Sequence, residues 1–322
     1  MKILVTGAAG FIGSHLAERL VADGHDVAGL DSFSTFLYDA ARKERNVAAL
    51  ERDARFRLIR GDVLDRAVVD EACRGSDVVV HLAALAGVGP SLHEPARYAR
   101  VNLEGTANVL EACRAGGVAR LVFASSSSVY GARPADSAPF REDDSCQRPV
   151  SPYAASKRAG ELLCSMYRDV HGLGVSALRF FTVYGPRQRP DMAIHKFAAT
   201  IAAGQPIEMR GDGTTARDYK YVDDIVDGVV AACAKVEPGA FDIYNLGGSR
   251  TTTLARLVEL IGDALGVVAK VAIGPEQPGD VPLTCADIGK AARELGYRPR
   301  VTLEDGLRRF VDWLTVDPCR DT

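Results

Sequence analysis

A glycine-rich turn lies between the first apolar run of the chain and the first stretch with helical periodicity. The opening reads Lys2-Ile-Leu-Val-Thr-Gly7-Ala-Ala-Gly10-Phe-Ile-Gly13, so three glycines fall where a strand gives way to a helix beginning near Phe11. The N-terminus of a helix presents unpaired N–H groups and a positive partial charge, so an anion binds there if no side chain blocks its approach. The arrangement predicts a site for a dinucleotide pyrophosphate; a Gly-rich structural turn is the alternative.

Asp31 follows the second apolar run, at residues 27–30. A carboxylate at the end of this strand accepts hydrogen bonds from the adenosine ribose hydroxyls and repels a 2′-phosphate. The sequence therefore predicts NAD rather than NADP as the cofactor. The alternative for Asp31 is a solvated carboxylate at the end of a strand.

Short β-branched runs alternate with stretches of helical periodicity along the first 180 residues. Strands are expected at residues 3–6, 27–30, 56–60, 78–82, 121–124 and 175–181, and helices at 15–23, 38–51, 102–115 and 153–171. Alternation of this kind is typical of a parallel sheet with crossover helices, here with about six strands. We predict an α/β fold, a Rossmann-like doubly wound parallel sheet followed by a smaller α/β C-terminal lobe.

Composition restricts the class of partner. The 322 residues carry 39 basic and 42 acidic side chains, a net charge of −3, so no global positive field attracts nucleic acid or anionic lipid. The seven cysteines are scattered and lack metal-ligand spacing, which favours core thiols in a reducing cytoplasm and no metal site. No apolar run approaches the roughly 20 residues of a membrane helix. We expect a cytoplasmic protein with no signal peptide and no membrane or nucleic-acid partner.

Tyr153 and Lys157 lie four residues apart and therefore share one face of the predicted helix. A phenol with a pKa of about 10 is a poor base at neutral pH, but a lysine cation and a positive nicotinamide ring would lower that pKa. The serines at 125–128 directly follow a predicted strand, at the sheet edge where open α/β folds bind ligands. Tyr153 is predicted to remove a hydroxyl proton; a serine-rich structural turn beside an ordinary helix is the alternative.

Together these motifs resemble the extended short-chain dehydrogenase/reductase family. They are TGAAGFIGSHL at the start, GDV at 61–63, HLAA at 81–84, SSSSVYG at 125–131 and the Tyr-x-x-x-Lys pair. Three later segments, RFFTVYGPRQRPDM at 179–192, RDYKYVDD at 217–224 and QPGDVP at 277–282, are similar to those of nucleotide-sugar 4-epimerases, above all UDP-glucuronate 4-epimerases. The resemblance covers nearly the whole chain.

The resemblance implies roles by position. It places the catalytic hydroxyl on Ser126, the base on Tyr153 and the helper cation, which also holds the nicotinamide ribose, on Lys157. The implied cofactor-binding residues are Gly7, Gly10, Phe11, Ile12, Gly13, Asp31, Asp62, Val63, Leu82, Ala83, Ala84, Asn102, Tyr153 and Lys157. The implied substrate-binding residues are Ser126, Ser127, Ser128, Tyr153, Thr182, Arg189, Arg217 at the diphosphate, Gln277 and Asp280 toward the uridine.

The residues expected around C6 of the sugar favour a uronate. Ser128 stands where related decarboxylases carry a glutamate, and Thr182 stands where UDP-galactose epimerases commonly carry an asparagine. Hydroxyls of this kind, with Arg189 nearby, could hold a carboxylate without promoting loss of carbon dioxide. Gly89-Pro90 and Arg187-Gln188 depart from the Arg-Tyr and Trp-Gly that are frequent in uronate epimerases, and both departures concern the sugar rather than the reaction type.

The activity implied by the resemblance is interconversion of UDP-glucuronate and UDP-galacturonate through a 4-keto intermediate, with NAD as transient hydride acceptor. A UDP-glucose or UDP-N-acetylhexosamine 4-epimerase is the alternative, followed by a nucleotide-sugar dehydratase, a decarboxylase and a non-catalytic dinucleotide sensor. The expected division is an NAD-binding domain at 1–178, with returning segments at about 220–247, and a nucleotide-sugar lobe at 179–219 and 248–322. The family resemblance also implies a homodimer.

Overall fold

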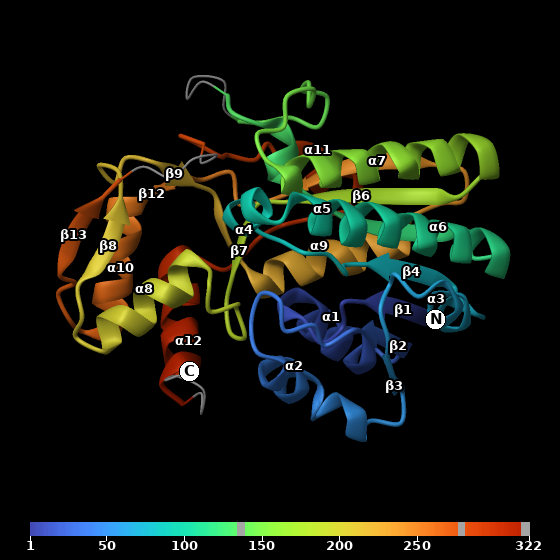
Figure 1. Ribbon diagram of the computed structural model, residues 1–322, viewed down its shortest axis with the longest axis horizontal. Coiled ribbons are helices and arrows are strands. Elements are labelled where there is room, and N and C mark those ends of the chain that lie inside the picture. The colour runs from blue at the N-terminus through green and yellow to red at the C-terminus, as the bar shows by residue number, and fades with distance from the viewer. Residues whose placement is uncertain (134–138, 276–280, 317–322) are drawn as a thin grey trace.

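A seven-stranded parallel sheet forms the centre of the computed structural model, which describes residues 1–133, 139–275 and 281–316 (Figure 1). The strand order is β11-β6-β5-β4-β1-β2-β3, and all neighbours pair in parallel. The strands are β1 (Lys2–Thr6), β2 (Asp26–Asp31), β3 (Phe56–Arg60), β4 (Val78–His81), β5 (Arg120–Ser126), β6 (Gly174–Phe180) and β11 (Phe241–Leu246). The predicted fold class, a Rossmann-like α/β sheet, is confirmed.

Alternate residues of each strand face opposite layers of helices. Ile3 and Val5 of β1 belong to the core that packs against α1 (Phe11–Ala22) and α9 (Val222–Lys235), whereas Leu4 faces the opposite core. That second core also contains residues of α3 (Arg66–Cys73), α6 (Gly105–Gly116) and α7 (Pro152–His171). Because both faces of the sheet are covered, its central strands β1 and β4 are mostly apolar, as expected for a buried parallel sheet.

The remaining elements are short, and many of them were not predicted. Beside the glycine turn and the sheet edge lie α2 (Ala40–Val47), the 3-10 turn η1 (Leu50–Arg52), α4 (Val88–His93), α5 (Pro95–Ala99), the π-helical turn η2 (Arg100–Glu104) and the 3-10 turn η3 (Ser127–Tyr130). Helices of five to eight residues span too few turns to show a clear 3.6-residue period. The single helix expected at 38–51 is therefore two elements, α2 and η1.

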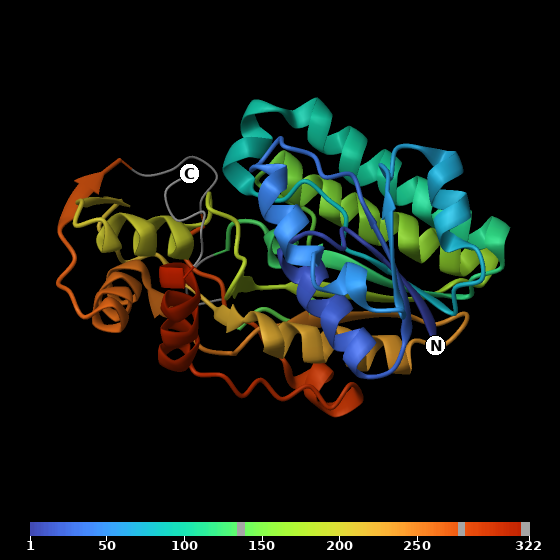
Figure 2. The same ribbon diagram turned by 90° about the horizontal axis from the view of Figure 1, so that it is seen from below.

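The C-terminal elements form a smaller group beside the sheet (Figure 2). Its helices are α8 (Ala193–Ala202), α10 (Leu254–Leu265) and α12 (Leu303–Val316), while α11 (Gly289–Glu294) packs near β11. Three two-stranded sheets join β7 (Thr182–Tyr184) to β10 (Tyr219–Tyr221), β9 (Ala216–Arg217) to β12 (Thr252–Thr253), and β8 (Ile207–Arg210) to β13 (Val271–Gly274). These small sheets were not predicted, because strands of two to four residues carry no alternation.

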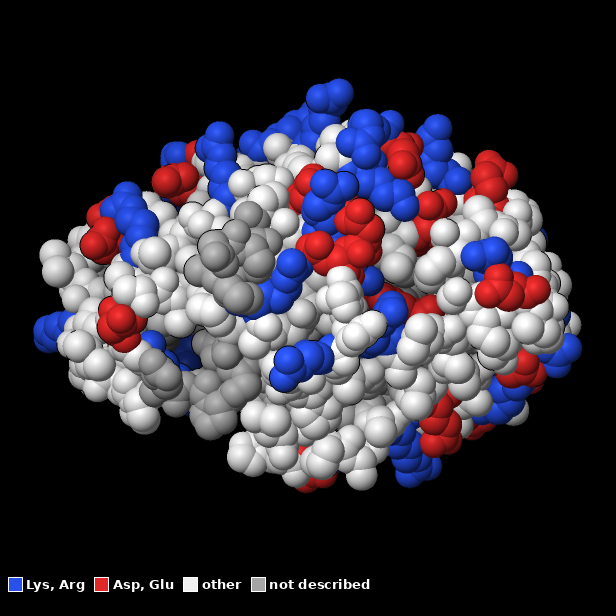
Figure 3. All heavy atoms as spheres, turned by 90° about the horizontal axis from the view of Figure 1, so that it is seen from above, with Lys and Arg blue, Asp and Glu red and all other residues white. Residues whose placement is uncertain are grey.

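The surface carries both signs of charge. Figure 3 shows one face of the molecule, on which Lys and Arg side chains lie beside Asp and Glu side chains. Within the described residues, no helix combines the length and apolar character needed to cross a bilayer. The same part of the chain holds no group of three His, Cys, Asp or Glu side chains placed to bind a metal ion. Five of its six cysteines are buried, as predicted for core thiols.

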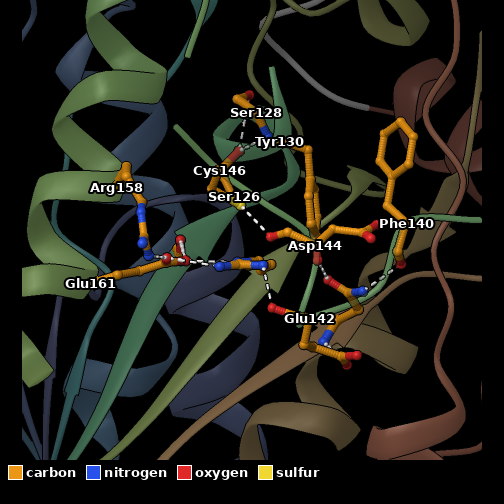
Figure 4. Close-up of polar contacts among 12 residues, drawn as sticks. Ser126, Ser128, Tyr130, Phe140, Glu142, Asp144, Cys146, Arg158 and Glu161 are labelled. Carbon is orange, nitrogen blue, oxygen red and sulfur yellow. Dashed lines mark hydrogen bonds and ion pairs between the residues drawn. The ribbon is translucent and has the colours of Figure 1, made fainter. Parts of the chain in front are cut away.

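A buried ion pair joins α7 to two strands of the sheet. The Glu161 carboxylate accepts from Arg179 Nε and Nη2 at 2.8 and 2.9 Å, and both side chains are almost fully buried. Burial alone would raise the pKa of Glu161, but the hydrogen bonds and charge of Arg179 lower it below its ordinary value. Ser125 Oγ on β5 donates to the same carboxylate at 2.6 Å, and Figure 4 shows Arg158, also on α7, reaching it, with Nη1 donating to Oε2 at 2.8 Å.

Removing Glu161 is expected to destabilise the protein far more than removing its surface partner. Glu161→Ala leaves the Arg179 charge buried without a partner, a change that costs about 3–5 kcal/mol. Arg158→Ala removes only the ion pair that Arg158, whose own side chain is 31 % exposed, forms with Glu161. Ion pairs made by partly exposed side chains contribute less than about 1 kcal/mol. Urea unfolding of the two variants measures both losses, and equal small losses would show that the buried pair does not hold the helix.

Candidate active site

A cleft of about 1030 Å³ opens at the carboxyl ends of the central strands. Its lining contains most of the predicted site residues, namely Gly7, Gly10, Phe11, Ile12, Gly13, Asp31, Asp62, Val63, Leu82, Ala83, Ala84, Ser126, Ser127, Ser128, Tyr153, Lys157, Thr182 and Arg189. Asn102 and Arg217 do not line it, and Gln277 and Asp280 lie outside the described residues. Such a volume is at the upper end for small-molecule sites and suits two large ligands side by side.

The three glycines of the first turn are required for different reasons. Gly7 adopts a left-handed backbone with φ +74, and a Cβ there would lie 2.9 Å from Ala83 N. A Cβ on Gly13 would lie 2.0 Å from Gly7 O, so this glycine permits the helix to pack on the turn. A Cβ on Gly10 would meet only Gly7 O, at 3.1 Å, and Gly10 lines the cleft. The turn thus leaves a cradle at Gly10 that a methyl group would fill, which fits a dinucleotide approaching the N-terminus of α1.

Asp31 ends β2 and connects the glycine turn to the next loop. Its carboxylate accepts from Ala9 N at 3.1 Å and from Phe33 N at 2.8 Å. Lys43 Nζ on α2 lies 3.6 Å from Asp31 Oδ1, and both residues line the cleft. Lys43 was not predicted as a site residue, because the sequence signal there was only the helical period of α2. The carboxylate is in place to receive ribose hydroxyls at the cleft wall.

Ser126 and Tyr153 meet where β5 and α7 approach each other. The Ser151 side chain caps α7 by accepting from Ala154 N at 3.1 Å, and Pro152 occupies its first turn, so Tyr153 is held at the helix start. Ser126 Oγ accepts from Ser128 N at 3.2 Å and donates to Ser128 Oγ at 3.1 Å (Figure 4). Burial raises the pKa of Tyr153, while a hydrogen bond with Ser126 and the charge of Arg189 oppose that rise.

Lys157 lies one helical turn beyond Tyr153 and is 5 % exposed. Its Nζ donates to Ala124 O at 2.7 Å and lies 5.3 Å from the centre of the Phe123 ring. Burial lowers the pKa of Lys157 to about 8. That Lys157 and a bound nicotinamide ring lower the pKa of the Tyr153 phenol stays a prediction; Ser126 and Arg189 also act to lower it.

Asn102 lies beneath the cleft, at the π-helical turn η2. Its Oδ1 accepts from Leu85 N at 2.7 Å, and its Nδ2 donates to Leu85 O and Ser156 Oγ, both at 2.9 Å. Ser156 in turn donates to Tyr153 O at 2.8 Å. The side chain therefore connects the loop after β4 to the first turn of α7. This geometry makes Asn102 a support of the cleft, and its place along the cofactor stays a prediction.

Three hydroxyl groups and one arginine line the same cleft. They are those of Ser127, Ser128 and Thr182, where β7 begins, and of Arg189. Arg189 Nη2 donates to Ala86 O at 3.0 Å and forms an ion pair with Asp191 Oδ2 at 2.6 Å. Asp191 was missed in the sequence, although Arg-x-Asp at 189–191 was the available signal. For Arg217, on β9, the role at a diphosphate stays a prediction.

Comparison with known proteins places the chain in a family. The model of the NAD dependent epimerase/dehydratase family matches residues 3–247. The UDP-glucuronate 4-epimerase of Thermodesulfobacterium geofontis is 39 % identical over 96 % of this chain and 95 % of its own length. The structure of UDP-glucuronic acid 4-epimerase from Bacillus cereus in complex with UDP-glucuronic acid and NAD is 38 % identical, with a TM-score of 0.92 over 97 % of this chain and 98 % of that one.

A neutral-sugar relative is also similar. The UDP-glucose 4-epimerase of Thermotoga maritima, in complex with UDP-glucose, is 31 % identical and superposes with a TM-score of 0.89 over 98 % of this chain and 99 % of that chain. These similarities confirm the predicted resemblance to nucleotide-sugar epimerases, and the cofactor predicted from Asp31 is the one in the family's name. With the glycine cradle, the serine turn and the Tyr153–Lys157 pair gathered in one cleft, the chain belongs to the NAD dependent epimerase/dehydratase family.

Proposed function

We propose that the protein interconverts UDP-glucuronate and UDP-galacturonate as an NAD-dependent 4-epimerase. One observation carries the proposal: a single cleft is lined by the dinucleotide cradle, by the Ser126–Tyr153–Lys157 group, and by Ser127, Ser128, Thr182 and Arg189. Catalysis needs the base and the reacting carbon to be held together, and sugar specificity needs complementary groups around C6. The chain supplies both in the same cleft.

Tyr153 acts as the base on the sugar C4 hydroxyl, and Ser126 holds that hydroxyl beside it. Bound NAD supplies a hydride acceptor that is regenerated in each turnover. The phenolate that accepts the proton is stabilised by its hydrogen bond with Ser126 and by the charge of Arg189. The 4-keto sugar would turn within the cleft, the hydride would return to the other face of C4, and Tyr153 would return the proton to the C4 oxygen, so that C4 is inverted with no net oxidation. Lys157, fixed on Ala124 O, orients the ribose next to this centre.

The C6 carboxylate of the sugar binds at the hydroxyl-lined part of the cleft. Ser127, Ser128 and Thr182 can donate hydrogen bonds that stabilise its charge, and loss of carbon dioxide would forfeit those bonds. Arg189 contributes less than a lone guanidinium would, since Asp191 neutralises it at 2.6 Å. A neutral hexose would leave the same donors short of an acceptor, and this disfavours the alternative of a UDP-glucose or UDP-N-acetylhexosamine 4-epimerase.

The proposal also covers the domain division of the chain, its oligomeric state and its location in the cell. The chain divides into an NAD-binding part at 1–178, with the returning segments at about 220–247, and a nucleotide-sugar lobe at 179–219 and 248–322. A homodimer is supported by an apolar stripe on α7, where Leu162, Met166 and Val170 are 57, 40 and 64 % exposed at four-residue intervals. A cytoplasmic location is supported by the free thiols of the described cysteines.

Incubating the purified protein with UDP-glucuronate, and separately with UDP-glucose, tests the proposed substrate. We expect UDP-galacturonate to form without added NAD and without a pentose product, because the hydroxyls around C6 retain the carboxylate. Chromatography resolves the C4 epimers. UDP-galactose as the only product would refute the assignment of the C6 site, and UDP-xylose would refute the argument from Ser128.

Two glycine substitutions test whether the cradle binds the dinucleotide. Gly10→Ala should lower the free energy of unfolding of the NAD-free protein much less than Gly13→Ala, because its methyl group meets only Gly7 O, at 3.1 Å rather than 2.0 Å. It should weaken NAD binding by at least about tenfold, since the methyl group occupies the cradle. Gly13→Ala should unfold more readily, because its Cβ would lie 2.0 Å from Gly7 O. Calorimetric titration with NAD measures the binding; unchanged affinity in Gly10→Ala would contradict the cradle.

A further inference from the structure

The loop between β7 and α8, residues 185–192, forms one wall of the cleft. Arg189, Asp191 and Met192 line the cleft from this loop, and Gly7, Gly10 and Gly13 line the same cleft from the glycine turn. A dinucleotide seated on the glycine turn would therefore share the cleft with the loop. Anything that ties the loop to the turn controls how easily that ligand leaves.

Arg187 makes such a connection toward the glycine turn. Its Nη1 and Nη2 donate to Glu18 Oε1 and Oε2 on α1, at 2.9 and 2.6 Å, in a bidentate pair. The same Nη1 lies 3.5 Å from Asn46 O on α2. Asn46 is buried and donates through Nδ2 to Ala9 O, within the glycine turn, at 2.9 Å. Arg187 therefore ties the loop to both helices that flank the turn.

The loop is also anchored on its other side. Arg189 Nη2 donates to Ala86 O, in the segment after β4, at 3.0 Å. Gln188 is buried, its Nε2 donates to Val183 O at 3.0 Å, and its carbonyl contacts His195 Nδ1 at 2.7 Å. The loop is therefore attached at two places, to α1 through Arg187 and to the segment after β4 through Arg189.

The backbone at Arg187 shows that this attachment is maintained against strain. Arg187 has φ 64, in the left-handed region that residues other than glycine seldom adopt. Such a conformation persists only when surrounding contacts compensate for it, and strained residues of this kind cluster at ligand clamps. The Glu18 carboxylate, 39 % exposed, and the Arg187 guanidinium, 19 % exposed, are the contacts that compensate here.

We propose that the Arg187–Glu18 ion pair is a strap that slows release of the bound dinucleotide. The inference rests on the proposed NAD-dependent function and adds cofactor retention to it. An epimerase regenerates its cofactor in every cycle, so no step of turnover requires the strap to open. Arg187 and Glu18 do not line the cleft, and they act on the ligand only through the loop.

The test measures NAD retention directly, without any sugar. Wild type, Glu18→Gln and Arg187→Gly are loaded with NAD, desalted and diluted into NAD-free buffer, and the NAD that remains bound is followed over time. Arg187→Gly removes the guanidinium and also relieves the backbone strain, so loss of NAD by this variant cannot be ascribed to strain. Arg19→Gln is the matched control, because Arg19 is the next residue on α1 but pairs with Asp227 and Asp23 instead.

Both strap variants should lose NAD about three- to tenfold faster than wild type and Arg19→Gln. High salt should speed the loss from wild type and leave Glu18→Gln unchanged, because it screens an ion pair that this variant lacks. Equal loss rates in all four proteins would overturn the strap. A wild type that retains NAD longer than its strap variants but does not epimerise UDP-glucuronate would instead refute the proposed function and leave the strap standing.

Discussion

Glu161 is the buried carboxylate on which the geometry of the site depends. It lies one helical turn after Lys157 and two turns after Tyr153 on the same face of α7, and it accepts hydrogen bonds from Arg179 on β6 and Ser125 on β5. Because a helix is stiff, the bonds that hold Glu161 against the sheet also hold Lys157 and Tyr153 in place relative to the sheet. The neighbouring Lys157–Ala124 bond is a second point of attachment to β5.

The same ion pair supports the serine turn from the other side. The Arg179 guanidinium lies 4.7 Å from the centre of the Tyr130 ring, and Tyr130 OH donates to Asn245 Oδ1 on β11 at 2.7 Å. Tyr130 ends the 3-10 turn that begins after Ser126. Helix α7 and the serine turn thus share one buried network, which is why a base and a hydroxyl from segments far apart in sequence can be held at one place (Figure 4).

The sequence singled out the residues at the cofactor end of the cleft, but it missed most of the residues that hold the site in place. Gly7, Gly13 and Asp31 act through backbone geometry and strand position, and such requirements leave a local pattern that can be read without a structure. Lys43 acts through Asp31, on another element, so no local pattern identifies it, whereas Asp191 pairs with Arg189 two residues away and its Arg-x-Asp signal was missed. Asn102 lies between these two cases. The family resemblance singled it out, but only the fold shows that its side-chain amide bonds Leu85 and Ser156.

Helices and strands, too, were predicted only where a local sequence pattern marks them. The long helix α7 was predicted at 153–171 and observed at Pro152–His171, because a full period repeats several times along it. Helices α3, α4 and α5 and the two-stranded sheets of the C-terminal group were missed, since a few residues cannot display a period. The strand pairings between β7 and β10 or between β9 and β12 join segments more than 30 residues apart, and only tertiary packing decides them.

The central claim is that α7 presents Tyr153 as the base at C4 of the sugar, and one pair of variants tests it most directly. Tyr153→Phe removes the phenol at the cleft, whereas Tyr167→Phe removes a phenol on the same helix that bonds Glu111 instead. The account predicts that kcat for UDP-glucuronate falls about 10²–10⁴-fold in Tyr153→Phe and stays near wild type in Tyr167→Phe, with NAD content unchanged in both. A Tyr153→Phe enzyme that keeps the wild-type kcat would contradict it.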